Sequence, residues 1–210
     1  MSLKIYSTAA DDGDVQADCN PGGICDAFGD SVISTANNIR VGDFFSPVTQ
    51  VRWRGFYVFD ISSLSGPVNS AVLWVFYNNS WGPGGLDTAP DSAEVGHVIV
   101  DHLDDYTPLD KTDYEAVAKS ANIGTIIGDD VAATMDWHTL DVTAQVNIDI
   151  GEAGTPDNSC FRLRQSVEGV IGLGERNEWR IRSGEAPGGD FTTSAHLLIE
   201  GGQIMMMRIT

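Results

Sequence analysis

The sequence predicts an all-β protein, a two-sheet antiparallel β-sandwich of jelly-roll type with one short helix. Apolar and polar residues alternate with a period of two in most of the apolar segments. Gly, Asn, Asp and Pro separate these segments, and only one stretch has helical spacing. The chain has 210 residues and no evident linker or internal repeat, so we expect a single domain over residues 1–210.

The expected strands run from one end of the chain to the other. LKIYST is the first, and the acidic, loop-rich segment of residues 1–50 adds short strands at DSVIST and NIRVGD. WRGFYVFDIS at 53–62 and SAVLWVFYN at 70–78 are apolar on both faces, as central strands of a packed sandwich are. Further strands are expected at 94–103, 137–146, 160–166, 178–184 and 194–201. The apolar tail 203–210 would add a last strand or dock on a neighbouring subunit.

One helix is expected after the strand at 94–103. TDYE at 112–115 has the spacing of a capping box, and Gly124 lies where a helix would end. The apolar residues between them fall on one helical face; they are Tyr114, Val117, Ala118 and Ala121.

The charge balance limits the partners. The chain has 30 Asp and Glu against 12 Lys and Arg, a formal net charge of -18. This balance argues against nucleic acid and anionic membranes as partners, because phosphate contacts need clustered cations. No segment approaches the roughly 18 consecutive apolar residues of a membrane span. The N-terminal segment also lacks the apolar run of a secretory signal, so we expect synthesis in a cytoplasm.

Four aspartates gather in DDGDVQAD: Asp11, Asp12, Asp14 and Asp18. Ca²⁺ takes 6 to 8 oxygen ligands, so a calcium site is one interpretation of this loop. The spacing is not that of an EF-hand, and a solvated acidic loop is the other interpretation.

Three cysteines do not make a disulfide framework. Cys19 and Cys25 flank a turn, NPGGI, that would let them bridge, and the sequence leaves that bridge open. Cys160 opens an expected strand and is predicted to be a buried thiol. No fourth ligand for zinc lies at a sensible spacing.

Two similar segments, FRLRQS and WRIRSG, contain four of the twelve cations: Arg162, Arg164, Arg180 and Arg182. Strand alternation would point the intervening apolar residues inward and these arginines outward, on one face if the two strands pair. Either they pair with Asp and Glu across strands, or they form a cationic platform for an acidic glycan or subunit. Trp81, expected in a loop, would stack on a sugar or contact a subunit.

The sequence does not predict an enzyme. GDSV at 29–32 superficially resembles an esterase motif, but a nucleophilic Ser31 needs a histidine base oriented by a carboxylate. The four histidines are scattered along the chain. Asp60 in FDIS and Asp141 in LDVT are expected to accept hydrogen bonds from nearby backbone N–H groups and so to cap turns.

Five segments occur in order between residues 50 and 201: RGFYVFDISSLSGPVNSAVLWVFY, WHTLDVTAQV, FRLRQS, RIRSGEA and AHLLIE. Together they resemble the DNRLRE-type jelly-roll domain. The namesake hexapeptide is absent, and residues 11–50 are longer and more acidic than in that family. The resemblance implies a non-catalytic β-sandwich of the kind found in secreted polysaccharide-binding proteins and in structural genes of tailed phages. The DY…DYEAV…IG segment makes this chain more similar to the phage group.

From the resemblance we expect a non-enzymatic virion structural protein, a capsid decoration or head/tail accessory protein of a tailed phage. It would be made in the host cytoplasm, lie on the virion surface, and bind the major capsid or other virion proteins. Sister copies would join as a homo-oligomer, with a trimer as our guess. The alternatives are a carbohydrate-binding module for acidic polysaccharide on a secreted protein, or an extracellular filament or surface-layer subunit.

Overall fold

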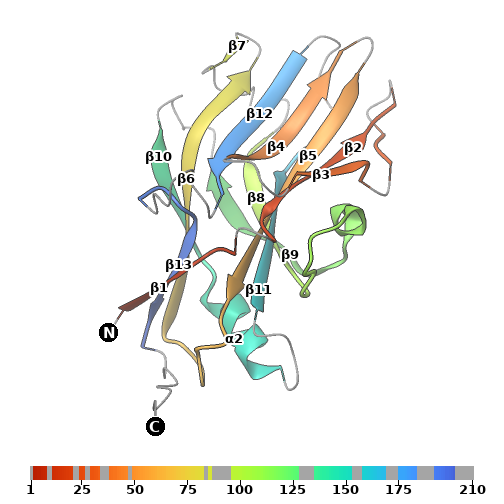
Figure 1. The fold of residues 1–210 in the computed structure, drawn as a ribbon. Helices are drawn as coiled ribbons and strands as arrows, with labels where there is room; N and C mark the ends of the chain where they lie inside the picture. The colour runs from red at the N-terminus through yellow and green to blue at the C-terminus, as the bar shows by residue number, and fades with distance from the viewer. Residues whose placement is uncertain are drawn as a thin grey trace.

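The protein is all-β and antiparallel with one α-helix, as a computed structural model of the chain shows (Figure 1). The structure describes residues 2–8, 11–20, 24–26, 29–33, 38–46, 49–82, 85–86, 96–127, 135–152, 158–168, 175–183 and 192–201. The tail 203–210 lies outside them. Among the described residues, no helix is long and apolar enough to cross a membrane.

Strands account for most of the described chain. The first seven are β1 (Ser2–Tyr6), β2 (Gly13–Asp18), β3 (Ser31–Ile33), β4 (Asn38–Phe45), β5 (Gln50–Asp60), β6 (Ser70–Gly82) and β7 (Gly85–Leu86). The others are β8 (Val98–Leu103), β9 (Ala118–Ile127), β10 (Asp136–Asp141), β11 (Asn158–Gln165), β12 (Glu175–Arg182) and β13 (His196–Glu200). The helical elements are the 3-10 helix η1 (Lys111–Glu115) and the α-helix α2 (Thr143–Gly151).

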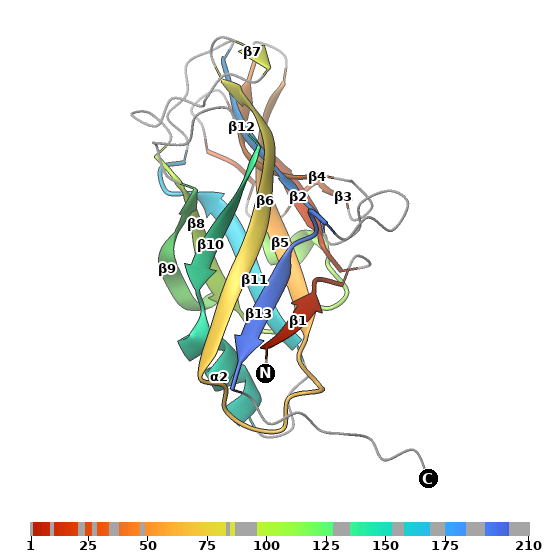
Figure 2. The same cartoon turned by 90° about the vertical axis from the view of Figure 1, so that its left-hand side faces the viewer.

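The strands form two layers joined by shared hydrogen bonding. The main path runs β1-β13-β6-β12-β4-β5-β11-β8-β9, with β10 on β6 and β2 on β5. In Figure 2, β10, β6, β13 and β1 form the layer nearest the viewer, and β5, β11 and β8 lie behind it. The long strand β6 belongs to both halves of the path, because it pairs with β13 through Trp74 and with β12 from Tyr77 onward.

The main core lies between the layers. Tyr57 and Phe161 from one layer are fully buried in the same cluster as Leu73 and Leu197 from the other. Burying each such side chain contributes about 1.5–3 kcal/mol. Because many such side chains are buried between the two layers, the sandwich is stable.

A second, smaller core lies on the opposite face of β5 and β11. Phe56 and Val58 alternate with the residues of the main core and pack with Val15 of β2, Tyr114 of η1 and Cys160. The predicted burial of the Cys160 thiol is confirmed. β2, β3 and the segment around η1 therefore cover the outside of this layer.

The prediction of an α-helix beginning at TDYE is wrong. The capping box uses Asp110 and Asp113 and supports only the short helix η1, after which the backbone of Ala116 becomes extended. From Ala118 onward the chain pairs with β8. Sheet pairing with β8 therefore overrides the helical spacing of the apolar residues.

The α-helix lies instead at 143–151, overlapping what the sequence predicts as one strand, 137–146. The strand ends at Asp141, whose carboxylate accepts a hydrogen bond of 2.9 Å from the Thr143 backbone N–H. Asp60 accepts a similar bond of 2.9 Å from the Ser62 N–H. Both aspartates cap turns as predicted, and the turn at Asp141 begins α2.

Candidate functional site

The arginines of β11 lie on the face opposite the main core. Phe161 and Leu163 point into the core, so Arg162 and Arg164 point the other way, as strand alternation predicts. Arg162 is only 7% exposed. It binds Asp101 of β8 at 2.8 Å and donates to the carbonyl oxygens of Tyr114 and Ala116 at 3.1 and 2.9 Å. Its guanidinium therefore joins the sheet to the segment that covers it.

Asp101 is the acceptor at the centre of this arrangement. Both Arg162 and Arg164 donate to its carboxylate, and the Asn122 backbone N–H donates a further bond of 2.8 Å. Burial alone would raise the pKa of Asp101, but the bonds from Arg164, Asn122 and Arg162 hold it below its ordinary value. The aspartate is thus kept ionised between two arginines.

A second group of charges lies next to the first on the outside of β5. Arg54 donates to both carboxylate oxygens of Glu168, at 3.0 and 2.7 Å, and its guanidinium stacks over the Tyr114 ring at 4.2 Å. Arg52 binds Asp43 at 2.6 Å and lies 3.7 Å from Glu168. Burial would raise the pKa of Glu168, but the bonds from Arg54 hold it below its ordinary value.

The arginines of β12 have a different partner. Glu178, which is fully buried, accepts from Arg180 at 2.6 Å and from Arg176 at 2.6 Å. Arg182 is half-buried, and its carbonyl oxygen accepts a 2.7 Å bond from the Tyr57 hydroxyl. Arg176 and Arg180 of β12 therefore form ion pairs with a glutamate of the same strand.

FRLRQS and WRIRSG do not pair, so the condition for one shared arginine face is not met. β11 pairs with β5 and β8, β12 pairs with β4 and β6, and β4 and β5 lie between them. Pairing with carboxylates across strands, the first of the two interpretations, is confirmed for Arg162 and Arg164, whereas Arg180 binds Glu178 of its own strand. The four arginines do not form one open platform, since Arg162 is buried beneath the segment around η1.

The four aspartates of the N-terminal segment differ in burial and in hydrogen-bond partners. Asp14 is fully buried and binds Arg40 at 2.9 Å, and Asp12 accepts a bond of 3.0 Å from the Val58 N–H. Asp11 lies in a turn and Asp18 is exposed at the end of β2. Among the residues that the structure describes, no three His, Cys, Asp or Glu side chains are placed to hold a metal ion. The calcium interpretation thus gains no support from the placement of these side chains.

Trp81 lies in β6, where its backbone pairs with Glu178, and not in a loop as predicted. Its side chain is outside the described portion of the structure. Other aromatic rings gather on the outer face of the same strand. Trp74 stacks on His196 with ring centroids 5.9 Å apart, and Trp137 meets both rings edge-on.

A polar cluster that the sequence does not reveal joins β8, β9, β11 and α2. Asp149 accepts from His102 Nε2 at 2.9 Å, from Ser159 Oγ at 2.6 Å and from Lys119 Nζ at 3.0 Å. The carboxylates around Lys119 raise its pKa above the ordinary value, although burial opposes this. A pocket of about 310 Å³ lies beside the cluster. Its lining is Asp104, Asp105, Thr107, Lys119, Asp149, Glu152 and Asn158.

This cluster lacks the geometry of a catalytic triad. In a triad the serine hydroxyl donates to the imidazole and the carboxylate orients that imidazole from its other side. Here the Ser159 hydroxyl donates to Asp149, and both Ser159 and His102 are fully buried. The cluster anchors α2 to the sheet, and no signal in the sequence spacing brings its residues together.

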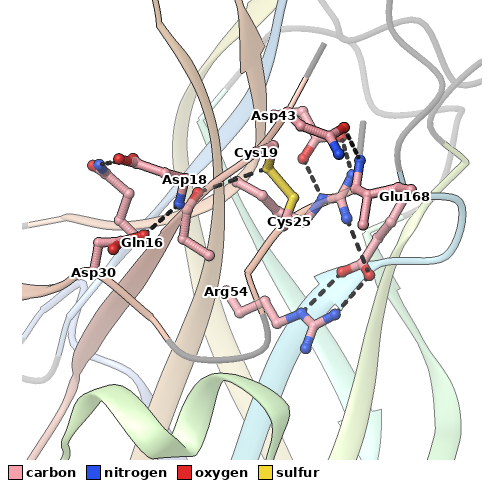
Figure 3. The surroundings of a disulfide bond; sticks show 12 residues. Gln16, Asp18, Cys19, Cys25, Asp30, Asp43, Arg54 and Glu168 are labelled. Carbon is pink, nitrogen blue, oxygen red and sulfur yellow. Dashed lines mark hydrogen bonds and ion pairs between the residues drawn. A yellow bond between two sulfur atoms is a disulfide. The ribbon is translucent and has the colours of Figure 1, made fainter. Parts of the chain in front are cut away.

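Cys19 and Cys25 form a disulfide, which settles the alternative that the sequence leaves open. Figure 3 shows the bridge beside Asp18, at the end of β2, and Asp30, with Arg54 and Glu168 also in view. Asp30 accepts a 2.6 Å bond from the Asp18 backbone N–H. Burial raises the pKa of the remaining thiol, Cys160, well above its ordinary value.

Comparison with known proteins finds neither a matching protein family nor a curated protein of similar sequence.

Proposed function

We propose that the chain is a non-enzymatic structural protein of a particle surface, a capsid decoration or head/tail accessory protein of a tailed phage. The observation that carries the proposal is the burial of three arginines against carboxylates inside the protein. Arg52, Arg54 and Arg162 are each less than 10% exposed and bound to carboxylates. Arg162 also donates to the carbonyl oxygens of Tyr114 and Ala116 and so holds the covering segment on the sheet, as expected of a rigid structural protein.

The excess of carboxylates makes the exterior acidic. The formal net charge is -18, and each buried arginine Arg52, Arg54 and Arg162 is matched by a carboxylate. An acidic outer surface keeps a protein soluble when many copies are held close together. It also disfavours contact with nucleic acid.

The edge strand β1 supports contact between sister copies. Within the described chain β1 pairs only with β13, and Ser2, Lys4 and Tyr6 are exposed along it. An unpaired strand edge is a template for a strand of another chain. We propose that this edge contributes to a homo-oligomer, with a trimer as the expected form.

The disulfide supports a final location outside a reducing cytoplasm. Disulfides persist in secreted proteins and on virion and cell surfaces, and are rare where thiols are kept reduced. We propose that the protein is made in the host cytoplasm and lies on the released particle. By contrast, the burial of Arg162 takes one of the four arginines out of the platform on which binding of an acidic polysaccharide would rest.

Purified particles test the proposal. The chain should sediment with virions on a density gradient, in a fixed ratio to the major capsid protein. Recombinant protein added to particles that lack it should bind until the same ratio is reached. Particles that contain none of the chain and bind none of it would overturn the proposal. Light scattering of the free protein should give three times the mass of one chain, which is 22.5 kDa, and the mass of a single chain would contradict the trimer.

A further inference from the structure

We propose that the outer face of β6 and its neighbours β10, β12 and β13 binds a second copy of this chain, with aromatic rings as the apolar contact and Arg182 as the partner of a carboxylate from that copy. The inference deepens the proposed function: it takes from it the presence of sister copies and names the surface that joins them. This surface is turned toward the viewer in Figure 2. We call it the ring face and define it by Trp74, Phe76, Trp137, Arg182 and His196.

Strand alternation places Arg182 beside the rings. Ile181 of β12 lies opposite Tyr77 of β6 in the sheet, and both are buried in the main core. The residues next to them, Arg182 and Phe76, therefore point outward on neighbouring strands. On the other side of β6, Trp137 of β10 lies opposite Phe76 and points the same way. The guanidinium thus lies on the same surface as these rings.

The rings form a continuous row across the strands. His196 lies opposite Trp74, and the two rings stack with centroids 5.9 Å apart. Trp137 meets both His196 and Phe76 edge-on, with centroids 5.3 Å apart in each case. Tyr6 of β1 contacts His196 at 5.6 Å. The row therefore runs from β10 to β1, the edge strand that we propose as a contact between sister copies.

The composition of the ring face is that of a protein interface. Trp, Tyr, Phe, Met and Arg are enriched at the centres of such interfaces, and Lys, Glu and Asp are depleted. Trp74, Phe76 and Trp137 are half-buried, and Met135, just before β10, is 65% exposed. The other outward residues at the centre of the face are uncharged; they are Val72, Thr139 and Leu198. This composition favours a protein as the occupant.

Two nitrogen donors on the ring face lack an acceptor. Arg182 Nε and Trp74 Nε1 are buried, and neither has a hydrogen-bond partner in the part of the chain that the structure describes. A buried donor left without an acceptor is costly. By contrast, Arg180 of the same strand binds Glu178. Arg182 is only half-buried as a residue, so a partner that brings a carboxylate to this surface can reach its guanidinium.

Charge complementarity identifies a second copy as the occupant. The chain has a formal net charge of -18, so a sister copy offers many carboxylates, and two copies repel each other where their acidic surfaces meet. The uncharged centre of the ring face avoids that repulsion, and Arg182 attracts an acid. Because this centre carries no acid, the carboxylate comes from a different surface of the sister copy. Such a heterologous contact closes into a ring when the rotation between copies allows it, as a trimer requires.

Charge reversal at Arg182 tests the contact. Light scattering of the free protein over a dilution series gives the dissociation constant of the oligomer. Arg182→Glu should raise that constant by about tenfold or more, because two carboxylates would then face each other. Lys111→Glu is the matched control, since it changes the net charge equally at an exposed position on η1. It should associate as the wild type does, and urea unfolding should show that both variants are folded.

Two further measurements test the rings. Trp137→Ala should raise the dissociation constant by about thirtyfold, as truncation of a central interface tryptophan does. Hydroxyl-radical labelling of the wild type needs no variant. Labelling of Met135 and Trp137 should fall severalfold at protein concentrations where the chain associates, because the sister copy covers them.

Three results would overturn the inference. They are a single-chain mass at every concentration, variants at Arg182 and Trp137 that associate as the wild type does, and labelling of the ring face that does not change on association. If Trp137→Ala fails to fold, Arg182→Glu and the labelling of the wild type still decide the question.

Failure of the inference is distinguishable from failure of the proposed function, which is tested by binding to particles. A wild type that stays a single chain but binds virions would leave the proposed function standing and overturn the inference. If Arg182→Glu then abolished that binding, the ring face would belong to a contact with another virion protein.

Discussion

Arg54 and Glu168 are 114 residues apart in the sequence and bind each other through two nearly parallel hydrogen bonds, of 3.0 and 2.7 Å. The pair joins a central strand, β5, to the segment that follows β11. Such bidentate pairs are among the stronger charge-assisted contacts, because the planar guanidinium matches both carboxylate oxygens.

Glu168→Gln should lower the free energy of unfolding by about 2 kcal/mol, because Arg54 would keep a buried charge with only the more exposed Glu115, 3.2 Å away, as its counter-ion. Urea unfolding followed by tryptophan fluorescence would measure the loss. Glu200→Gln is the matched control, since Glu200 is exposed at the end of β13. Equal shifts for the two variants would show that the Arg54 pair has no special role.

Asp101→Asn should cost more, about 3–5 kcal/mol at pH 7, because two arginines lose one shared partner. The lowered pKa of Asp101 makes this loss depend on pH. The stabilisation is present above the ordinary aspartate pKa of about 3.9 and is lost as pH falls through the lower folded value. The gap between wild type and variant, measured by urea unfolding, should therefore narrow below about pH 4. A gap that stays constant from pH 7 to pH 2.5 would contradict this explanation.

Asp113 should give stability the opposite dependence on pH. Burial raises its pKa to about 6, although the Asp110 N–H bonded to it opposes the shift. The folded state then holds a proton that the unfolded state has already lost between about pH 4 and pH 6, so stability falls as pH rises through this window. Asp113→Asn should remove that fall and raise the urea midpoint at pH 7, with little change at pH 3.5. A variant that is less stable than wild type at pH 7 would show that the bond to Asp110 outweighs the burial.

Gly42→Ala should destabilise the protein by more than about 2 kcal/mol. Gly42 has a φ of +139°, and an added Cβ would meet the Asn177 carbonyl oxygen of β12. Gly151→Ala is the control, because its Cβ would meet no atom within 4 Å. Thermal unfolding of both variants would separate them, and similar melting temperatures would argue against a special need for glycine where β4 pairs with β12.

The strands could be predicted because their cause is local. Side chains alternate between two faces of a strand, so the pattern around Phe161 and Arg162 already indicates which residue is inward. The turn caps at Asp60 and Asp141 are local in the same sense, and both are confirmed. For these features the sequence within a few residues contains the physical reason.

The neighbours of each strand could not be predicted in this way. FRLRQS and WRIRSG look alike, yet β4 and β5 separate them, because packing of the whole core decides strand order. The helix at TDYE fails for a related reason, since pairing with β8 outweighs the helical spacing. The cluster around Asp149 draws on four elements, and no local pattern connects them.

The inward arginines have a consequence for behaviour in concentrated salt. Dissolved ions screen exposed charges over distances of about 8–10 Å at moderate ionic strength, but they act far less on buried pairs. Added salt should thus relieve repulsion among the outer carboxylates while leaving the contacts at Asp101 and Glu178 largely intact. A protein arranged in this way gains stability as its surroundings become more saline.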